Sequence, residues 1–542
     1  MKPVFDLKAA APLGRRQGVT ARLITPLLLL VLPLAFFLSL FSWQVLDIGN
    51  AGWLLRGTDN GENALGAHAY WHDPTTGASL RNSLLNAPDG EPVLFTDSNP
   101  LLTLLAKPFA AWLPADAQLV GPFILATLIL QAFFAWLLLR RHAPGPIALW
   151  AGVALLAFPP TLANRFMHAN LMAHWTILAA LWLFLDPVRR AKLRWWAPLI
   201  AITAMIHSYL LVMVGAIWAS AMLASFVEAR GRDRVALIGH GVTILAIVAL
   251  LARWMGVEGQ RSTGSLGRFA MPIDALWNPG IAGFSRLMPT SAGHTWFEGF
   301  QYLGAGGLVL MIAAVAIAWR RPMAGEERTV LTRLRWLAPA LIVLATVALL
   351  RQPLPAALTA LLDPVRASGR LFWPMAYTLV LLALLAVYRL SAERAGMLLI
   401  SLIALQVFDL GGMAATIRQQ SADAANHRLY EHTPDPRWDQ LIAQSNSIAF
   451  MSGDVGFDLQ LYQEVTWRAI KAGRPVNTAY AARAGTATIQ RLQAEAEALE
   501  QGRLVPGRLY ILINQTKLPA AVATTAGARI LHIDGRTVIA PR

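Results

Sequence analysis

The segment RGTDNGENAL at residues 56–65 brings Arg56, Asp59 and Glu62 together in a chain of 542 residues of which 14% are charged. Asp59 and Glu62 are three residues apart, so they would share one face of a helix. Two interpretations of the pair are open. Asp followed three residues later by Glu at a helix start is close to a capping box. A carboxylate that is partly desolvated at a membrane surface has instead the chemistry of a general base. The local sequence alone favours the cap.

Further acids and arginines stand in segments that are distant in the sequence. Asp97 lies in LFTDSNPLL, where Ser-Asn-Pro predicts a turn that leads into a helix. Glu298 precedes the apolar segment 302–319, where an acid gains from the helix dipole. Arg366 and Arg370 lie in DPVRASGRLFWP, and arginines at a helix start suit phosphate contacts. Snorkelling of these two side chains to lipid headgroups is an equally good interpretation.

Three histidines also fall at the ends of apolar segments. His168 and His174 are six residues apart, which is not the spacing of a helical His-x3-His metal site. Capping or interfacial hydrogen bonding therefore explains them more simply than zinc does. His207, in HSYLL, has the same ambiguity. The chain has no Cys, which excludes disulfides and thiolate metal sites.

The elements that must position these side chains belong to a strongly apolar chain. It is 56% hydrophobic with 19 Trp, and its mean hydropathy is +0.48. A soluble domain has no use for this much apolar surface, and Trp collects at membrane interfaces, so we expect a polytopic α-helical membrane protein. Eleven apolar segments are candidate spans: residues 23–43, 119–139, 146–163, 171–186, 195–207, 209–227, 236–253, 302–319, 336–350, 371–388 and 395–411.

The connectors between these segments predict an orientation. The net charge of +15 comes from basic clusters in alternate connectors, which is a topology signal rather than a nucleic-acid site. The positive-inside bias makes residues 1–22 cytoplasmic, with the first apolar segment kept as a helix rather than cleaved. Residues 23–411 then form the transmembrane domain. The regions expected outside are the loops 44–118, 254–301 and 351–370 and the tail 412–542.

The tail has a different character from the rest of the chain. It is polar and charged, and a helical pattern at 486–502 ends in Gly. Strands that alternate with helices predict a small periplasmic α/β domain over 412–542. The expected strands are residues 447–452, 509–514, 528–533 and 537–540.

The ionisable residues avoid the spans and gather in the predicted outer loops. A transporter usually buries such residues inside its spans. This distribution therefore favours chemistry at the outer membrane boundary. Transport of a lipid-linked glycan and a non-catalytic scaffold role remain the alternatives.

Several motifs occur in a characteristic order along the chain. They are the Thr-Asp after the first span, FTDSNPL, HANLMAHW, GRFAMPIDALWNP, FEGFQYLG and ASGRLFWP. Together they resemble an uncharacterised bacterial family of multi-pass inner-membrane proteins related to the GT-C glycosyltransferases. The resemblance covers about residues 25–410. It implies transfer of a sugar from a polyprenyl-phosphate or polyprenyl-pyrophosphate lipid to a glycan or lipid acceptor on the periplasmic face.

The resemblance also implies roles for particular residues. Asp59 matches the essential acid of the first outer loop. Asp97 and Glu298 match further outer-loop acids, and with Asp59 they are the candidate metal ligands. Glu62 is a further acid that could bind a metal or the acceptor. Arg366 or Arg370 would hold the lipid phosphate. The cofactor implied in some members is Mg²⁺ or Mn²⁺. The Asp-Glu or Asp-x-Asp signature is absent, because the sequence reads Thr-Asp-Asn, and this leaves the dependence on a metal open.

Overall fold

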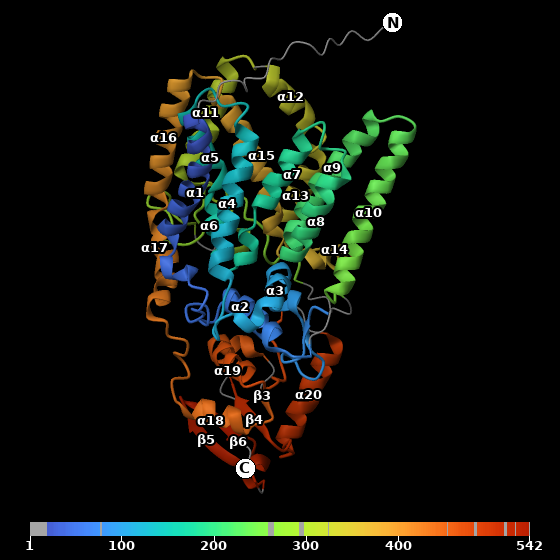
Figure 1. Cartoon of the computed structure of the whole chain (residues 1–542), viewed down its shortest axis with the longest axis vertical. Coiled ribbons are helices and arrows are strands. Elements are labelled where there is room, and N and C mark those ends of the chain that lie inside the picture. Colours follow the sequence, from blue (N-terminus) through green and yellow to red (C-terminus); the bar gives the residue numbers. More distant parts are fainter. Residues whose placement is uncertain are drawn as a thin grey trace.

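The computed structural model contains three layers along its longest axis (Figure 1). A helical bundle lies at the end nearest the N-terminus, the first long connection forms the middle layer, and the C-terminal domain lies at the opposite end. The predicted cytoplasmic segment 1–22 falls largely outside the described residues. The structure describes residues 19–75, 79–257, 265–291, 297–323, 325–451, 454–481, 485–513, 517–525 and 527–540.

Each of the eleven apolar segments contains a helix of the bundle. The long uninterrupted runs of Leu, Ile, Val and Ala give these helices apolar side chains all round, as expected for helices buried or surrounded by lipid. The helices are α1 (Val19–Leu40), α4 (Val120–Leu139), α5 (Pro146–Ala157), α7 (Trp175–Leu185), α8 (Leu193–Ile206), α9 (Ser208–Glu228), α10 (Arg232–Trp254), α11 (Gly304–Arg320), α13 (Ala338–Leu349), α15 (Trp373–Val387) and α16 (Ala392–Asp409).

Length and composition support several membrane crossings. In the described part of the chain, five helices are long and apolar enough to cross a membrane, or up to seven if each of two bent helix pairs is one span. The remaining apolar helices have 10–17 residues. The multi-pass character is therefore supported, while the number of eleven crossings stays a prediction.

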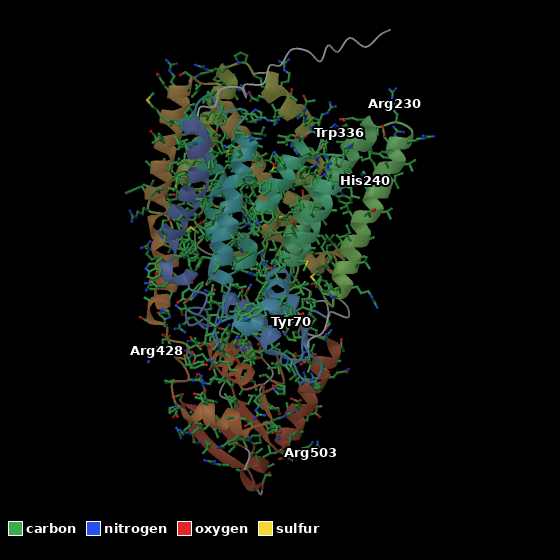
Figure 2. The ribbon with its side chains drawn as sticks, viewed as in Figure 1. Tyr70, Arg230, His240, Trp336, Arg428 and Arg503 are labelled. Atoms are coloured by element: carbon green, nitrogen blue, oxygen red, sulfur yellow. The ribbon has the colours of Figure 1, made fainter. Side chains whose placement is uncertain are left out.

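The helix at the edge of the bundle exposes apolar side chains. On α10, Val235, Val242, Leu245 and Leu250 are between 62% and 70% exposed. Such a continuous apolar surface is unfavourable in water and is typical of a helix that faces lipid. Figure 2 shows Arg230, in the connector that precedes α10, at the end of the bundle away from the C-terminal domain.

The break that the sequence places near His207 is a turn between two packed helices. Ile206 ends α8 and Ser208 begins α9, and the backbone of His207 between them is extended. The two helices pack against each other. The apolar segments 195–207 and 209–227 are therefore two separate helices joined by a turn.

The first long connection folds into the middle layer. The predicted helix after residue 58 is α2 (Asp59–His72), and the predicted turn and helix after Asp97 end in α3 (Pro100–Ala106), where Asn99 caps the first turn through Leu102 N. A two-stranded ribbon lies between them. Its strands are β1 (Arg81–Asn82) and β2 (Glu91–Pro92). The middle layer also contains the 3-10 helices η1 (Trp43–Leu46), η2 (Val93–Thr96) and η3 (Lys107–Trp112).

The C-terminal domain is a small α/β unit, as the tail predicts. Its sheet has the order β3-β4-β6-β5, with β3 parallel to β4 and the other pairs antiparallel. Alternating apolar side chains give the sheet two buried faces, one packed with α19 and the other with α20. The elements are α18 (Arg437–Gln444), β3 (Ser447–Met451), α19 (Leu459–Lys471), α20 (Thr486–Glu500), β4 (Arg508–Leu512), α21 (Ala520–Thr524), β5 (Arg529–Ile533) and β6 (Arg536–Ala540).

The C-terminal domain is fastened to the middle layer by backbone hydrogen bonds. Val476 N donates to Leu84 O at 2.8 Å, and Ala87 N donates to Val476 O at 2.8 Å. Helix α19 packs directly on α2. The main apolar core continues without interruption from the bundle through this joint into the sheet. The three layers therefore share one packed core, and a site between them would be held by all three.

Candidate active site

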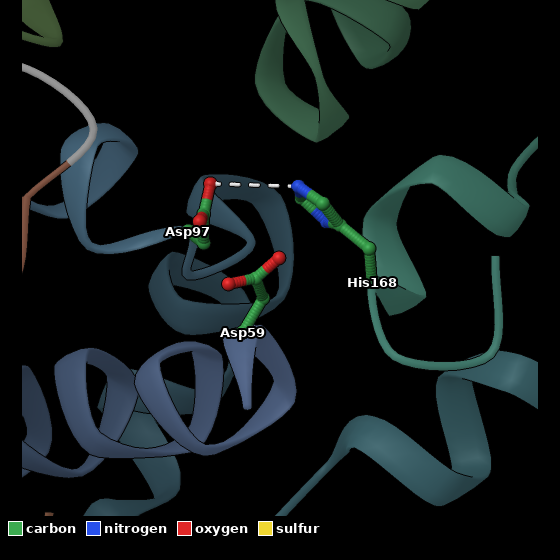
Figure 3. A group of neighbouring side chains, drawn as sticks. All are labelled: Asp59, Asp97 and His168. Atoms are coloured by element: carbon green, nitrogen blue, oxygen red, sulfur yellow. Dashed lines mark ion pairs between the residues drawn. The ribbon is translucent and has the colours of Figure 1, made fainter. Parts of the chain in front are cut away.

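Two carboxylates and one imidazole converge in the middle layer. Figure 3 shows Asp59, Asp97 and His168, and ligand atoms of all three lie within 4.8 Å of one another. Asp97 Oδ1 and His168 Nε2 are 3.8 Å apart. The three residues come from the start of α2, the end of η2 and the segment before the 3-10 helix η4 (Ala169–Met172). We call this group the open cluster.

Asp59 is held by its neighbours rather than by a cap of its own. Thr58 is the N-cap residue of α2 and Asp59 is the first helical residue. The interpretation of Asp59 as the cap is therefore wrong, and its carboxylate is not needed to cap the helix. The next residue anchors the turn, since Asn60 Nδ2 donates to Phe166 O at 2.7 Å and Asn60 Oδ1 accepts from Ala169 N at 2.8 Å. The start of α2 is thus tied to the segment that carries His168.

Asp97 is held in an uncommon backbone conformation. Its φ is +52°, in the left-handed region that Asp tolerates better than most residues. Two amides fix it there, because Asn63 Nδ2 and Asn170 Nδ2 donate to its carbonyl oxygen at 2.8 and 2.7 Å. The side chain of Asp97 is consequently directed by the backbone towards Asp59 and His168.

The charges of the open cluster are not compensated within it. Burial raises the pKa of Asp59, and the neighbouring charge of Glu298 raises it further. Burial and the charge of Asp59 likewise raise the pKa of Asp97. Burial lowers the pKa of His168 to about 3, so this imidazole is neutral and keeps a lone pair. Within the described residues, no hydrogen-bond donor satisfies either carboxylate, and the cluster suits a cation or a proton.

A second cluster, which we call the closed cluster, lies beside the first. Arg370 Nε and Nη2 both donate to the carboxylate of Glu298, and Arg165 Nη1 donates to Glu298 Oε2 at 2.8 Å. The guanidinium of Arg165 also lies 4.1 Å from the ring centroid of Phe297, and that of Arg370 lies 4.7 Å from that of Tyr209. Glu298 is predicted as a possible metal or acceptor ligand, but two arginines already engage it. Arg370, predicted to hold phosphate, is one of them.

The open cluster lines one large cavity of about 1180 Å³, together with Glu298 and Arg370 of the closed cluster. This is larger than ordinary ligand pockets, so the cavity has room for more than one small ligand. Its walls differ in chemistry. The polar wall holds the open cluster and part of the closed cluster, with His207 and Arg366 beside them. The apolar wall comes from α8, α9 and α10 and includes Ile206, Leu211, Val248, Ala252 and Met255. The third wall belongs to the C-terminal domain and includes Tyr480, Thr488, Ile489, Leu492 and Ala496.

The remaining predicted residues divide into those inside and those outside the cavity. His207 lines it, and its Nδ1 accepts from Tyr209 N at 3.1 Å. Glu62 does not line it, because this carboxyl is buried and accepts from Gln463 Nε2 at 3.0 Å. His174 is also buried away from it, and its Nδ1 lies 2.8 Å from the hydroxyl of Tyr377. The positions of Glu62 and His174 therefore favour a role in holding the fold together rather than in binding a ligand.

The sequence does not predict a role for three residues of this region: Arg165, Tyr480 and Gln463. Arg165 follows an apolar segment in NRFMHAN, and a cation at that place is a signal that was available. Tyr480 and Gln463 carry no such signal, since each lies in the C-terminal domain, far along the chain from the residues it faces.

The family of the chain can now be stated from a comparison. The family described as a domain of unknown function, DUF6311, matches residues 30–411. The chain belongs to this family. The C-terminal domain of DUF6311 matches residues 437–541. None of the curated proteins matches the chain.

Solved structures give a distant likeness to this DUF6311 protein. The archaeal oligosaccharyltransferase AglB from Archaeoglobus fulgidus, in complex with an inhibitory peptide and a dolichol-phosphate, is 13% identical with a TM-score of 0.35; the match covers 97% of this chain and 75% of that one. An oligosaccharyltransferase of the same organism in the apo form is 14% identical with a TM-score of 0.36, over 84% and 64%.

Proposed function

We propose that this protein is a membrane glycosyltransferase of the bacterial inner membrane. It transfers a sugar from a polyprenyl-phosphate or polyprenyl-pyrophosphate lipid to a glycan or lipid acceptor at the periplasmic face. The observation that carries the proposal is the cavity in which Asp59, Asp97 and His168 face an apolar wall on one side and the C-terminal domain on the other. The polar wall would contact the charged phosphate of the donor, the apolar wall its lipid tail, and the wall from the C-terminal domain the acceptor.

The apolar wall supports a lipid donor. Leu211 of α9 and Val248 and Ala252 of α10 line the cavity, and the outer surface of α10 is itself apolar and exposed. An isoprenoid chain could therefore pass from the bilayer along α10 while its phosphate reaches the polar wall. Burial of each methylene of such a chain contributes about 0.8 kcal/mol. Arg366 and the closed cluster would supply positive charge near the phosphate.

Asp59 is the proposed general base. Its carboxylate takes the proton of the acceptor hydroxyl as the acceptor oxygen forms a bond to the anomeric carbon of the sugar. The bond between that carbon and the phosphate oxygen breaks, and the polyprenyl phosphate leaves with the bonding electrons. Without a bound cation, burial raises the pKa of Asp59, which suits this role because a base works best when its pKa lies near the working pH. A cation bound beside it would lower that pKa.

The open cluster also fits a divalent cation. Two carboxylates and a neutral imidazole within 4.8 Å offer a donor set that Mg²⁺ or Mn²⁺ accepts. Asp59, Asp97 and His168 would hold the ion, and a carboxylate has two oxygens, so Asp59 can serve in both roles. When bound, the ion would supply positive charge opposite the departing phosphate. Glu298 is not among these ligands, since Arg165 and Arg370 occupy its carboxylate.

The proposal is tested by comparing cells that lack this protein with cells complemented by wild type, Asp59→Asn or Asp59→Ala. Lipid-linked sugars and envelope glycans are analysed by mass spectrometry. We expect both Asp59 variants, present in the membrane at normal levels, to lose the glycan and accumulate the lipid-linked donor. Asp47→Asn is the matched control, because Asp47 is a partly exposed acid of the same loop and does not line the cavity.

Two other results would redirect the interpretation. Normal glycan in both Asp59 variants would contradict the proposal. Transport of a fluorescent polyprenyl phosphate across liposomes containing the protein alone would favour the flippase alternative. If only removal of residues 415–542 abolished the glycan while the acids could be replaced freely, the scaffold alternative would stand.

A further inference from the structure

The side chain of Gln463, in α19 of the C-terminal domain, reaches the first turn of α2. It is fully buried and lines no part of the cavity. Its carboxamide oxygen accepts from Gly57 N at 2.9 Å, and its Nε2 donates to Thr58 O at 2.9 Å and to Glu62 Oε1 at 3.0 Å. Both amide hydrogens and the oxygen are therefore used on residues before and after Asp59 in the first turn of α2 and the segment that leads into it.

The packing around this carboxamide leaves no freedom. Gly61 faces it so closely that a Cβ on this residue would lie 2.4–2.6 Å from the carboxamide atoms of Gln463. Gly57 needs its left-handed φ of +70° to bring its N–H to the same group. The backbone on both sides of Asp59 is thus shaped to receive this one side chain.

Gln463 is itself held firmly from the side of the C-terminal domain. The next residue, Glu464, is fully buried, and its carboxylate accepts from the backbone N–H groups of Glu431, His432 and Thr433. About one turn further along, Trp467 Nε1 donates to Asp116 Oδ1 at 2.9 Å. The carboxamide therefore projects from a rigid helix rather than from a loop.

The opposite side of the same turn is tied to the bundle. Asn60 bonds to Phe166 O and Ala169 N, as described above, so it fixes the turn against the segment of His168. Asp59 consequently lies between two amide anchors, one from the bundle and one from the C-terminal domain. Removal of either anchor leaves the turn held from one side only.

We propose that Gln463 is a positioning residue through which the C-terminal domain sets the orientation of Asp59. Docking of the C-terminal domain then completes the active site from a distance, without contact between Gln463 and any substrate. The inference deepens the proposed function and rests on it in one respect, because Asp59 is taken to act on the acceptor.

The first experiment measures hydrogen exchange of the full-length protein in detergent, and it does not depend on the reaction. Gln463→Met keeps the volume of the side chain and removes its three hydrogen bonds, and Gln463→Ala also removes the packing. We expect the amides of residues 57–62 to exchange at least about tenfold faster in both. Lys471→Ala is the matched control, since Lys471 contacts Asp116 at 2.9 Å from the same helix in the same joint, away from Asp59. It should leave residues 57–62 unchanged.

The second experiment measures turnover of the same proteins with the lipid fraction that accumulates in cells lacking the protein, followed as release of polyprenyl phosphate. We expect kcat to fall about 30- to 100-fold in Gln463→Met, because small misplacements of a reacting group have effects of this size. KM for the lipid should change less than twofold. The double variant Glu62→Gln with Gln463→Glu, which restores one hydrogen bond in the reverse direction, should recover part of kcat.

The outcomes separate the two claims. Unchanged exchange of residues 57–62 in Gln463→Met, or an equal effect of Lys471→Ala, would overturn the positioning role. So would faster exchange without any loss of kcat. If wild type releases no polyprenyl phosphate although exchange responds as expected, the proposed function fails and the contact between the domain and the turn of Asp59 stands.

Discussion

The open and closed clusters lie side by side at one cavity and each contains three ionisable side chains, yet they are built in opposite ways. In the closed cluster, two guanidinium groups surround the single carboxylate of Glu298. In the open cluster, two carboxylates face each other and a neutral imidazole. Burial of an unpaired charge is costly, so it persists where a ligand or reaction repays it.

The difference teaches which residues to assign to chemistry. A carboxylate with two guanidinium partners has little capacity left for a cation or a proton, so we assign Glu298 to the framework of the polar wall. Asp59 and Asp97 retain that capacity. The closed cluster still influences the open one, because the charge of Glu298 contributes to the raised pKa of Asp59.

The largest expected effect comes from opening the closed cluster. Glu298→Ala leaves two buried guanidinium groups without a partner, and loss of one member of a buried ion pair costs about 3–5 kcal/mol. We expect a large fall in the thermal unfolding midpoint of the purified protein and a low yield in the membrane. Glu298→Gln, which keeps hydrogen-bond acceptance, should be milder. A stable, well-expressed Glu298→Ala protein would remove the structural assignment of this cluster.

A buried carboxyl outside both clusters, Glu91, sharpens the comparison. It has one amide partner and no guanidinium within hydrogen-bonding distance among the described residues. Asn86 Nδ2 donates to Glu91 Oε2 at 3.0 Å, and burial raises the pKa of Glu91 from 4.5 to about 7. The folded protein therefore holds a proton that the unfolded chain releases above pH 4.5. Stability from this group is present at low pH and is lost as the pH rises towards 7, by about 3 kcal/mol.

Glu91→Gln measures this dependence. The unfolding midpoint of wild type should fall between pH 5 and pH 8 by more than that of Glu91→Gln, and the variant should be the more stable protein at pH 8. Equal slopes for both proteins would show that Glu91 is not protonated in the folded state at pH 5.

The effect of a divalent cation on the free energy of unfolding should distinguish the open cluster from the closed one, and its expected size comes next in order. If Mn²⁺ binds the open cluster, a concentration of about 100 times its dissociation constant raises the free energy of unfolding by about 2.7 kcal/mol. EDTA should reverse the shift, and His168→Ala should reduce it. The expected shift is retained in Arg366→Gln, which changes charge in the cavity without removing a proposed ligand. Equal shifts in wild type and His168→Ala would contradict the assignment of the open cluster as the cation site.

The smallest expected effect is a gain of stability in the open cluster itself. In the absence of a divalent cation, and above pH 8 where Asp97 is ionised because burial raises its pKa to about 8, Asp97→Asn removes the repulsion between two neighbouring carboxylates. We expect the free energy of unfolding to rise by about 1 kcal/mol, measured as a higher unfolding midpoint in EDTA. A fall of similar size would mean that Asp97 is compensated in the folded protein.

The sequence predicts local elements here better than long-range partners. Apolar runs locate all eleven helices, and alternation with turn residues locates the four strands of the C-terminal sheet, because both patterns depend on neighbours along the chain. The acids Asp59 and Asp97 are identified through their motifs. The interpretation of Asp59 as a cap fails because Thr58 takes that position.

The roles of other residues depend on contacts across the fold. Nothing near Glu298 in the sequence indicates Arg165, and the two meet only because η5 (Phe297–Gly299) lies against the segment after α6 (Pro160–Ala163). The spacing of His168 and His174 does not resemble a metal site, and the structure instead pairs His168 with acids from the first loop. Gln463 lies about 400 residues from the turn it holds.

The most direct test of the central claim is release of polyprenyl phosphate by purified protein supplied with the lipid fraction that accumulates in cells lacking it. Loss of a general base typically reduces the rate about 100- to 10,000-fold. We predict release by wild type and at least about 100-fold slower release by Asp59→Asn, with an unfolding midpoint no lower than that of wild type. Release by Asp59→Asn within twofold of wild type would contradict the account.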